Sequence, residues 1–600
     1  MATNDSILRA ASDISATNIT ESVVANLTFT ERLAALPAYV WENKDLFILE
    51  SRLIFTSLAL IYLGSHAALR RPPSANPPKK SKKGRQQRDE DREDQYVHGL
   101  MLSDAILLPI LAGVVLVGFY YLIKWLEDPY LLNKILRVYF SCMSLASMGK
   151  LFADFLHFLT GFIFPTVWRA GDGKLYHIDS SKRGQWFTEG ESLRQVWDEK
   201  KKTPLPGRWS EWKLSDARNA LLWEVSHLLV EQWTIRLYIH GIISQKFKVK
   251  FNDILGIVLG VGVNIVYYVT QSTFLSNVMG WAFSYTSIII MSPTAFATGT
   301  AVLFGLFLYD IYMVFFTPYM VTVATSLDVP IKLVFEGPTK ASMLGLGDIV
   351  LPGIFVGLCL RFDQYMYYYR QRKLVPVDLI AKDESTDQLI TNTQTQSMVI
   401  KPDYVDPQGQ WGNWFWSTKL SKILSPDATP ALKASAFPKT YFHAAMIGYF
   451  VAMVTTLVML LVYHHAQPAL LYLVPGVVFT VWITGMLRGE LREMWNYTED
   501  GSLDTADKIV EVDGNGNVID SVNNDAGNNN VGEKPKGEQT MEAKDGAPSS
   551  VNSSEQKSPP LNEVREKVGK SKHKAKTSRK ERVPPVLLFS IETPDRDGDS

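Results

Sequence analysis

The chain has 600 residues, of which 46% are hydrophobic, and its 61 basic and 61 acidic residues give a formal net charge of zero. A neutral chain carries no whole-molecule argument for a nucleic-acid partner, so we expect none. The charged residues cluster in a few blocks and leave several apolar stretches of about 20 residues, the length that crosses a hydrocarbon core of about 30 Å. The sequence therefore predicts an all-α polytopic membrane protein with soluble appendages.

The N-terminal segment 1–46 lacks the cationic region and apolar core of a cleaved signal peptide, so we expect it to be retained. Three candidate glycosylation sequons lie in it, at Asn4, Asn18 and Asn26. The first span, 47–69, runs into a basic loop at 70–97, and such loops stay on the cytosolic side of a membrane. The N-terminus is therefore predicted to be lumenal, where sequons can be glycosylated.

Nine apolar segments are predicted to cross the membrane: 47–69, 102–123, 131–164, 251–270, 273–292, 296–318, 340–361, 440–463 and 468–487. If the N-terminus is lumenal, nine crossings place the C-terminus in the cytosol. The predicted organisation is a lumenal segment (1–46), three spans (47–165), a cytosolic insertion (166–250), four spans (251–361), a cytosolic loop (362–439), two spans (440–487) and a cytosolic tail (488–600). The tail is poor in aromatic residues and rich in polar ones, which predicts disorder.

One segment of the insertion, 219–243, has an ambiguous pattern. Its leucines and Val225 form one helical face, while Glu224 and Glu231 mark another. This pattern predicts an interfacial helix that lies on the membrane surface, and a tenth span remains the alternative.

Metal and disulfide chemistry have little support. Cys142 and Cys359, the only cysteines, fall in apolar segments and form no metal-binding or secreted disulfide pattern. The stretch 513–520 begins like a calcium loop, but Val518 occupies the position that requires glycine and Asn524 the position of the final glutamate. We expect no cofactor and no metal.

Two aspartates, Asp310 and Asp348, lie inside long apolar runs. A carboxylate within a membrane span is costly, so its default interpretation is functional. Each aspartate lies eight residues from the nearer end of the polar segment 318–340. If two antiparallel helices flank that segment, both aspartates lie roughly 12 Å below the same membrane face, and we expect them to meet.

Two carboxyl groups held together in a low-dielectric site cannot both ionise, so they share a proton. One then acts as the general base toward water and the other as the general acid toward the carbonyl or the leaving amine. This is the aspartic-protease route to peptide hydrolysis.

Two flanking patterns fit that chemistry. Gly345 and Gly347, on either side of Leu346, remove side chains next to Asp348 and would let a substrate backbone approach, although glycines also serve close helix packing. The second pattern is Gln467, Pro468, Ala469 and Leu470 at the start of the last span. Irregular backbone before such a proline can hold an extended peptide through free amides and carbonyls, although a proline at a helix start is also ordinary.

Taken together, the ordered motifs Tyr309-Asp310, Gly345-Leu346-Gly347-Asp348 and Pro468-Ala469-Leu470 resemble those of the GxGD intramembrane aspartyl proteases. The surrounding text is similar to signal peptide peptidase rather than to its presenilin relatives. The resemblance is strong over 251–495 and weak over 100–165.

The resemblance implies a presenilin-like fold of nine transmembrane helices in the endoplasmic reticulum membrane, with a lumenal N-terminus and a cytosolic C-terminus. It implies cleavage of transmembrane peptides within the lipid bilayer, such as signal-peptide remnants and type II membrane proteins. By motif matching, the catalytic pair is Asp310 and Asp348. The residues that shape the site are Tyr309, Gly345, Leu346 and Gly347, and those that position substrate are Gln467, Pro468, Ala469 and Leu470. A homo-oligomer is left open.

Two other classes stay open from the residues alone. Intramembrane carboxylates also serve proton-coupled transporters, and a relay could use Asp104, Lys124, Lys150 and Asp154. We find no inverted repeat with a matching broken helix in both halves, which argues against a transporter. A non-catalytic scaffold that binds membrane proteins is the other class, but such a scaffold has no reason to carry two costly aspartates. The tail shows no retrieval signal, so a Golgi or vacuolar location is the alternative to the endoplasmic reticulum.

Overall fold

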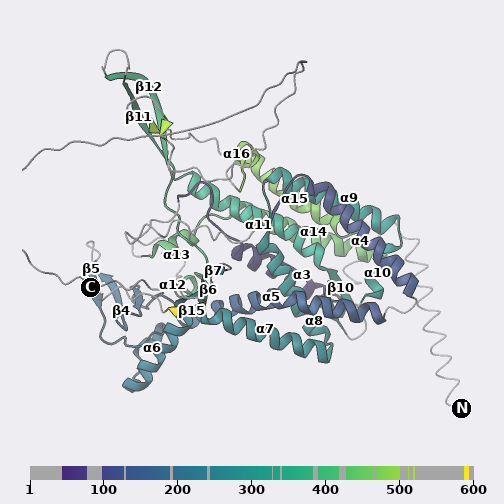
Figure 1. The fold of residues 1–600 in the computed structure, drawn as a ribbon, viewed down its shortest axis with the longest axis horizontal. Coiled ribbons are helices and arrows are strands. Elements are labelled where there is room, and N and C mark those ends of the chain that lie inside the picture. The colour runs from purple at the N-terminus through teal and green to yellow at the C-terminus, as the bar shows by residue number, and fades with distance from the viewer. Residues whose placement is uncertain are drawn as a thin grey trace, which may run out of the picture.

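The computed structural model describes residues 44–76, 98–126, 130–189, 194–239, 243–327, 329–337, 341–382, 389–417, 428–463, 467–499, 511–512, 518–519 and 587–592. Most of these residues are helical (Figure 1). The predicted lumenal segment with its sequons and most of the basic loop 70–97 lie outside the described residues.

A long helix lies at each of the nine predicted spans. They are α3 (Lys44–Ala67), α4 (Asp104–Leu126), α5 (Tyr130–Ile163), α7 (Phe251–Thr270), α8 (Thr273–Ile290), α9 (Phe296–Phe315), α11 (Leu346–Tyr369), α14 (Thr440–Tyr463) and α15 (Leu470–Arg488). Within the described residues, six of these helices are long and apolar enough to cross a membrane: α3, α4, α7, α9, α14 and α15. The chain is therefore a mostly helical polytopic membrane protein, and the count of nine crossings stays a prediction.

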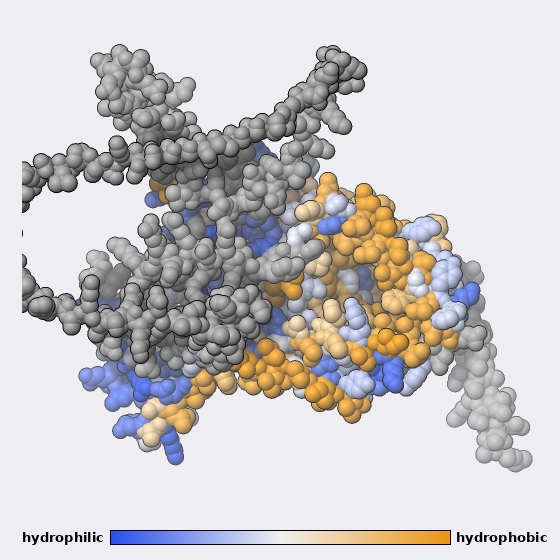
Figure 2. Space-filling view, in the orientation of Figure 1, coloured by the Kyte–Doolittle hydropathy of each residue, from blue (hydrophilic) through white to orange (hydrophobic). Residues whose placement is uncertain are grey.

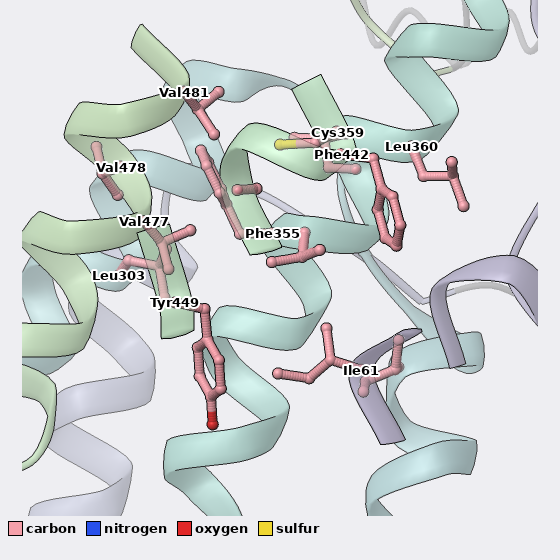
Figure 3. Close-up of a cluster of buried hydrophobic side chains, with 14 of the residues drawn as sticks. Ile61, Leu303, Phe355, Cys359, Leu360, Phe442, Tyr449, Val477, Val478 and Val481 are labelled. Atoms are coloured by element: carbon pink, nitrogen blue, oxygen red, sulfur yellow. The ribbon is translucent and has the colours of Figure 1, made fainter. Parts of the chain in front are cut away.

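Helix α11 is the centre of the bundle. From Ile349 onward it is buried on nearly every side, which is typical of a helix surrounded by other helices. Its neighbours include α3, α8, α14 and α15. Figure 3 shows Phe355 and Cys359 of α11 within a cluster of buried side chains that also includes Ile61, Tyr449 and Val477 from three other helices.

The outer helices present apolar side chains to their surroundings. Large exposed residues on α4 and α7 include Ile106, Val114, Ile257 and Val269. Figure 2 shows this apolar surface over the helices on the right of the view, with hydrophilic surface toward the lower left. A soluble monomer rarely exposes so much contiguous apolar surface, so a lipid-facing surface is the physical explanation.

The short elements gather at the two ends of the bundle. At what we name the hairpin end lie α10 (Tyr319–Ser326) and the antiparallel pair β9 (Lys332–Glu336) and β10 (Ala341–Gly345). At the opposite end, named the insertion end, lie α6 (Asp216–Val230), α12 (Trp411–Ser417), α13 (Pro430–Ser435), α16 (Leu491–Asn496), the 3₁₀ turn Gly207–Glu211, the parallel pair β1 (His98–Leu100) and β8 (Met291–Pro293), and the hairpin β11 (Lys373–Lys382) and β12 (Leu389–Ile400). Two further short strands are β13 (Glu511–Val512) and β14 (Val518–Ile519).

The predicted span 340–361 needs a correction at its start. Residues 341–345 form strand β10, and helix α11 begins only at Leu346. Apolar periodicity alone does not separate a short strand from a helix turn, and here pairing with β9 decides between them.

The insertion 166–250 is not helical throughout, so the all-α prediction is wrong for this part. It contains a four-stranded antiparallel sheet of β2 (Val167–Arg169), β3 (Leu175–Asp179), β4 (Gly184–Glu189) and β5 (Arg194–Trp197). Its small core consists of Trp168, Tyr176 and Phe187. Aromatic and β-branched residues favour strands once neighbours cover one face of the sheet.

The interfacial helix predicted at 219–243 is also shorter than expected. Helix α6 ends at Val230, and strands β6 (Gln232–Ile239) and β7 (Ile243–Lys250) follow. Trp223 of α6 is buried, and its indole nitrogen donates to the carbonyl oxygen of Lys202 at 2.9 Å. One face of this helix therefore packs against the insertion itself.

The tail was expected to be disordered from residue 488, and its first part is not. Helix α16 packs beside the end of α15, and the side chain of Glu499 is largely buried. Of the tail beyond Glu499, the structure describes only β13, β14 and β15 (Leu587–Glu592), so the remaining expectation of disorder lies outside the described residues.

Candidate active site

Asp310 lies near the end of α9 and is only 4% exposed. Its Oδ2 accepts a hydrogen bond from the backbone amide of Leu470 at 3.1 Å. Leu470 is the first residue of α15, and amides in the first turn of a helix have no partner within the helix. The start of α15 thus supplies a donor, and the positive end of a helix dipole, to a buried carboxylate.

Asp348 lies in the first turn of α11, just after strand β10. Asp310 and Asp348 are close enough to interact electrostatically, as expected for paired carboxylates. Tyr449 of α14 donates its hydroxyl to the backbone carbonyl of Asp348 at 3.4 Å. The structure therefore brings the two aspartates together. Each lies closer to its helix end than the eight residues expected from the sequence, because α9 ends at Phe315 and α11 begins at Leu346.

The glycines beside Asp348 have different surroundings. A Cβ on Gly345 would lie 3.3 Å from Oδ2 of Asp348, so a side chain there would press on the carboxylate. Among the described residues, a Cβ on Gly347 would meet Leu351 alone, at 4.0 Å, and Gly347 is exposed. The open space beside Asp348 therefore lies on the Gly347 side. The backbone amide of Leu346 donates to the carbonyl of Ile331 at 3.0 Å and ties the start of α11 to the β9 hairpin.

Tyr309 precedes Asp310 on α9 and is half-buried. A Cβ on Gly113 of α4 would lie 3.6 Å from its ring. The same two helices touch at Gly305, where a Cβ would lie 2.2 Å from the carbonyl oxygen of Ala105. Tyr309 is thus positioned at a close contact between α4 and α9.

The segment before α15 is irregular. Pro468 is buried, and Gln467 accepts a hydrogen bond from the hydroxyl of Tyr472 at 3.4 Å. Ala469 is the N-cap residue of α15, and no side chain of the described residues caps the helix there. All four residues predicted to position substrate therefore lie at the helix start that reaches Asp310.

Two residues that the sequence did not single out also belong to this site. Ser342 of β10 donates its hydroxyl to Oε1 of Glu50 on α3 at 2.6 Å. This bond holds the strand that leads into Asp348 against the first helix of the bundle. The sequence signal that could have found this contact is Glu50, which lies about one turn inside an apolar span. A charged residue in such a position rarely lacks a partner.

The charged residues weighed as an alternative transporter relay make local contacts in the described part of the chain. Oδ2 of Asp104 accepts from the amide of Met101 at 2.8 Å at the start of α4. Lys150 and Asp154 form an ion pair at 3.0 Å, and Tyr285 donates to the same carboxylate at 2.7 Å. These contacts are local pairs. Among the described residues, no cluster of three or more metal-ligating side chains occurs.

Comparison with known proteins places this arrangement in a family. The profile of the signal peptide peptidase family matches residues 91–501. A probable intramembrane protease of Schizosaccharomyces pombe is 31% identical over 269 residues, covering 44% of this chain and 69% of that protein. Intramembrane protease 2 of Caenorhabditis elegans is 30% identical over 278 residues and 47% of its length, and the signal peptide peptidase of Mus musculus is 30% identical over 273 residues and 54% of its length.

No solved structure matches the chain at a significant level. The last two relatives are matched over about half of their length, so the match supports the shared region rather than the activity of a whole relative. The family profile nevertheless covers well over half of this chain, including all nine long helices except the first. The chain therefore belongs to the signal peptide peptidase family.

Proposed function

We propose that this protein is an aspartic protease that hydrolyses peptide bonds within the membrane and that Asp310 and Asp348 are its catalytic pair. The hydrogen bond between Leu470 and Asp310 is the observation that carries the proposal, because it joins two of the three sequence motifs at one point. The electrostatic interaction of Asp310 with Asp348 brings in the third motif.

The geometry suits activation of water. The amide of Leu470 donates to Oδ2 of Asp310, and in this proposal Oδ1 takes the attacking water molecule. Asp348, on the facing helix, then protonates the substrate carbonyl or the leaving nitrogen as the proton passes between the two carboxyl groups. Hydrolysis adds one water across the amide bond and requires no cofactor. The low exposure of Asp310 strengthens these electrostatic interactions.

Strand β10 provides a docking surface for the substrate. Within the described residues it pairs on one edge only, with β9, and it leads directly to Gly345 and Asp348. An unpaired edge binds an extended peptide through backbone hydrogen bonds. A transmembrane substrate would unwind, lie along β10 and pass Gly347, which places no side chain of its own beside Asp348. Residues 467–470 would hold it from the opposite side.

We further propose nine crossings, a hairpin end that faces the lumen and an insertion end that faces the cytosol. The basic residues Arg70 and Arg71 at the insertion end support this orientation. Peptides in type II orientation, such as signal-peptide remnants, are the proposed substrates, and the endoplasmic reticulum membrane is the proposed location.

The direct test is cleavage of a labelled signal peptide by the purified protein in detergent. Asp310→Asn and Asp348→Asn should each abolish cleavage, and the double variant should be no worse than either, because residues that act as one unit are not additive. Asp104→Asn is the matched control, since the Asp104 carboxylate accepts from the backbone amide of Met101 at the start of α4. Near-normal turnover by either single variant would sink the assignment. Absence of cleavage by the unaltered protein, together with substrate binding, would favour a scaffold.

A further inference from the structure

The hairpin of β6 and β7 receives a third strand from a distant part of the chain. Strand β15 pairs with β6 in antiparallel register, from Leu587 opposite Ile239 to Glu592 opposite Thr234. Strand β6 is therefore central, with β7 on one edge and β15 on the other. Figure 1 labels the three strands close together, where β7 leads into α7. The catalytic chemistry proposed above makes no use of this sheet.

The sequence of β15 is suited to strand addition. Its six residues, LLFSIE, are mostly apolar and β-prone. Pro584 and Pro585 precede it and Pro594 follows. Because proline has no amide hydrogen to donate, it seldom continues a paired strand. The hydroxyl oxygen of Ser590 is buried, so the middle of the strand is covered rather than solvated.

The register matches residues of like chemistry. Leu587, Phe589 and Ile591 stand opposite Ile239, Leu237 and Ile235. The alternate positions pair Ser590 with Arg236 and Glu592 with Thr234, and β7 places Lys246 and Lys248 next to those two residues of β6. Since successive strand positions belong to opposite faces, Leu587, Phe589 and Ile591 belong to one face of β15. Leu588, opposite Tyr238, belongs to the other face together with Ser590 and Glu592. A shift by one residue would mix the two faces.

The sheet is attached to the membrane helices at its other end. Strand β7 runs into α7 at Phe251, and the amide of Lys250 donates to Asp253 at 2.8 Å. Asp253 also pairs with His157 of α5 at 2.8 Å. The docking edge is thus held in place by the packed pair of α5 and α7.

We propose that the outer edge of β6 is a docking site for an extended apolar peptide that ends in an acidic residue, and that residues 587–592 of the same chain are its occupant. Backbone hydrogen bonds along the strand provide affinity, and the alternating register provides specificity. Because occupant and edge belong to one chain, binding is intramolecular and favoured over binding of a free peptide. Any partner that uses this edge must displace the strand.

Two truncations of the full chain test the proposal by hydrogen–deuterium exchange. A chain that ends at Val586 lacks β15, whereas a chain that ends at Glu592 keeps it and serves as the matched control. In the shorter chain, exchange at β6 amides that faced β15 should accelerate at least about tenfold, while amides in the middle of α7 should be unchanged. A synthetic peptide of residues 584–594 should restore protection, and a scrambled peptide should not. Equal exchange in both truncations, or loss of protection already in the longer one, would overturn the assignment.

A disulfide test reads the register directly. In a Cys142→Ser/Cys359→Ala background with a protease site inserted between β14 and β15, Ser590→Cys combined with Arg236→Cys should bridge on mild oxidation. The tail should then stay attached after cutting until a reductant is added. Ser590→Cys combined with Leu237→Cys places the thiols on opposite faces and should bridge at least about tenfold less. Absence of a bridge in the first pair, or equal bridging in both, contradicts the proposed docking.

Discussion

At the residue scale, the site depends on one backbone amide. The N–H of Leu470 reaches a carboxylate on another helix because a helix start leaves that amide unpaired. A hydrogen bond to a charged group contributes roughly 1.5–3 kcal/mol, which corresponds to about ten- to a hundredfold in rate if it is needed in the transition state. The role of residues 467–470 can therefore be tested without removing a carboxylate.

We expect Leu470→Pro to lower kcat by about ten- to a hundredfold, because proline removes the amide that donates to Asp310. Leu470→Ala is the matched control: it keeps the amide and removes the same buried side chain. Cleavage rates of the two purified variants, with circular dichroism to check folding, decide the question. If alanine costs as much as proline, the side chain rather than the amide is responsible.

The two glycines next to Asp348 should respond differently to alanine. Gly345→Ala should disturb the Asp348 carboxylate directly, because its Cβ would lie 3.3 Å from Oδ2. Gly347→Ala meets almost nothing in the free protein, so thermal stability should be unchanged while KM rises if substrate passes there. Unaltered kinetics in Gly347→Ala would show that substrate approaches from another side.

At the scale of elements, α5 and α7 are held together by small residues. Gly256 lies against Ala153, where a Cβ would come within 2.5 Å of the backbone nitrogen, and Gly260 lies against Gly149. Close backbone approach of this kind gains dispersion energy in a bilayer, where the hydrophobic effect between helices is absent. Asn264 adds hydrogen bonds to the carbonyl of Ser141 and the hydroxyl of Ser144.

Gly256→Ala should therefore destabilise the protein by about 1–3 kcal/mol, the usual cost of overpacking. Gly262→Ala on the same helix is the control, since nothing lies within 4 Å of its Cβ position and alanine favours a helix. Thermal denaturation in one detergent compares the pair. Equal midpoints would mean that the α5–α7 contact is looser than the structure shows.

At the scale of the whole molecule, the segment after α16 contacts three distant parts of the chain through Glu499. Glu499 pairs with the buried Arg361 of α11 at 2.5 Å and with Arg70 after α3, and it accepts from Ser292 of β8 at 2.6 Å. Its amide donates to the carbonyl of Thr294 at 3.0 Å. These contacts join the first, central and last helices at the insertion end.

Removing this carboxylate leaves Arg361, 3% exposed, without its charge partner. We expect Glu499→Met to destabilise the protein by about 3–5 kcal/mol. The double variant Glu499→Met/Arg361→Met should recover a large part of that loss, because no buried charge is then left unpaired. Glu336→Gln, an exposed glutamate at the hairpin end, is the control. A double variant no more stable than Glu499→Met would argue against this coupling.

Orientation in the membrane gives a second whole-molecule prediction. The basic cluster after α3 predicts glycan on Asn18 or Asn26, with Asn4 as a residual site. The sequon at Asn496, exposed at the end of α16, should remain unmodified because it would face the cytosol. Endoglycosidase digestion of the unaltered protein and of the Asn18→Gln/Asn26→Gln variant shows whether the glycan is on the N-terminal sequons or on Asn496. Glycan on Asn496 would reverse the orientation.

The sequence by itself determined the class of protein, the position of each long helix and the candidate dyad. Long apolar runs and a carboxylate inside a span are local features whose cost does not depend on the rest of the fold. The strand β10, the sheet of the insertion and the shortened helix α6 could not be predicted, because short apolar runs become strands or helices according to the partner they meet. The bond from Leu470 to Asp310, the anchoring of β10 by Glu50 and the return of β15 to β6 join residues far apart in the chain. Only the tertiary structure decided them, since such contacts exist only once packing has brought the segments together.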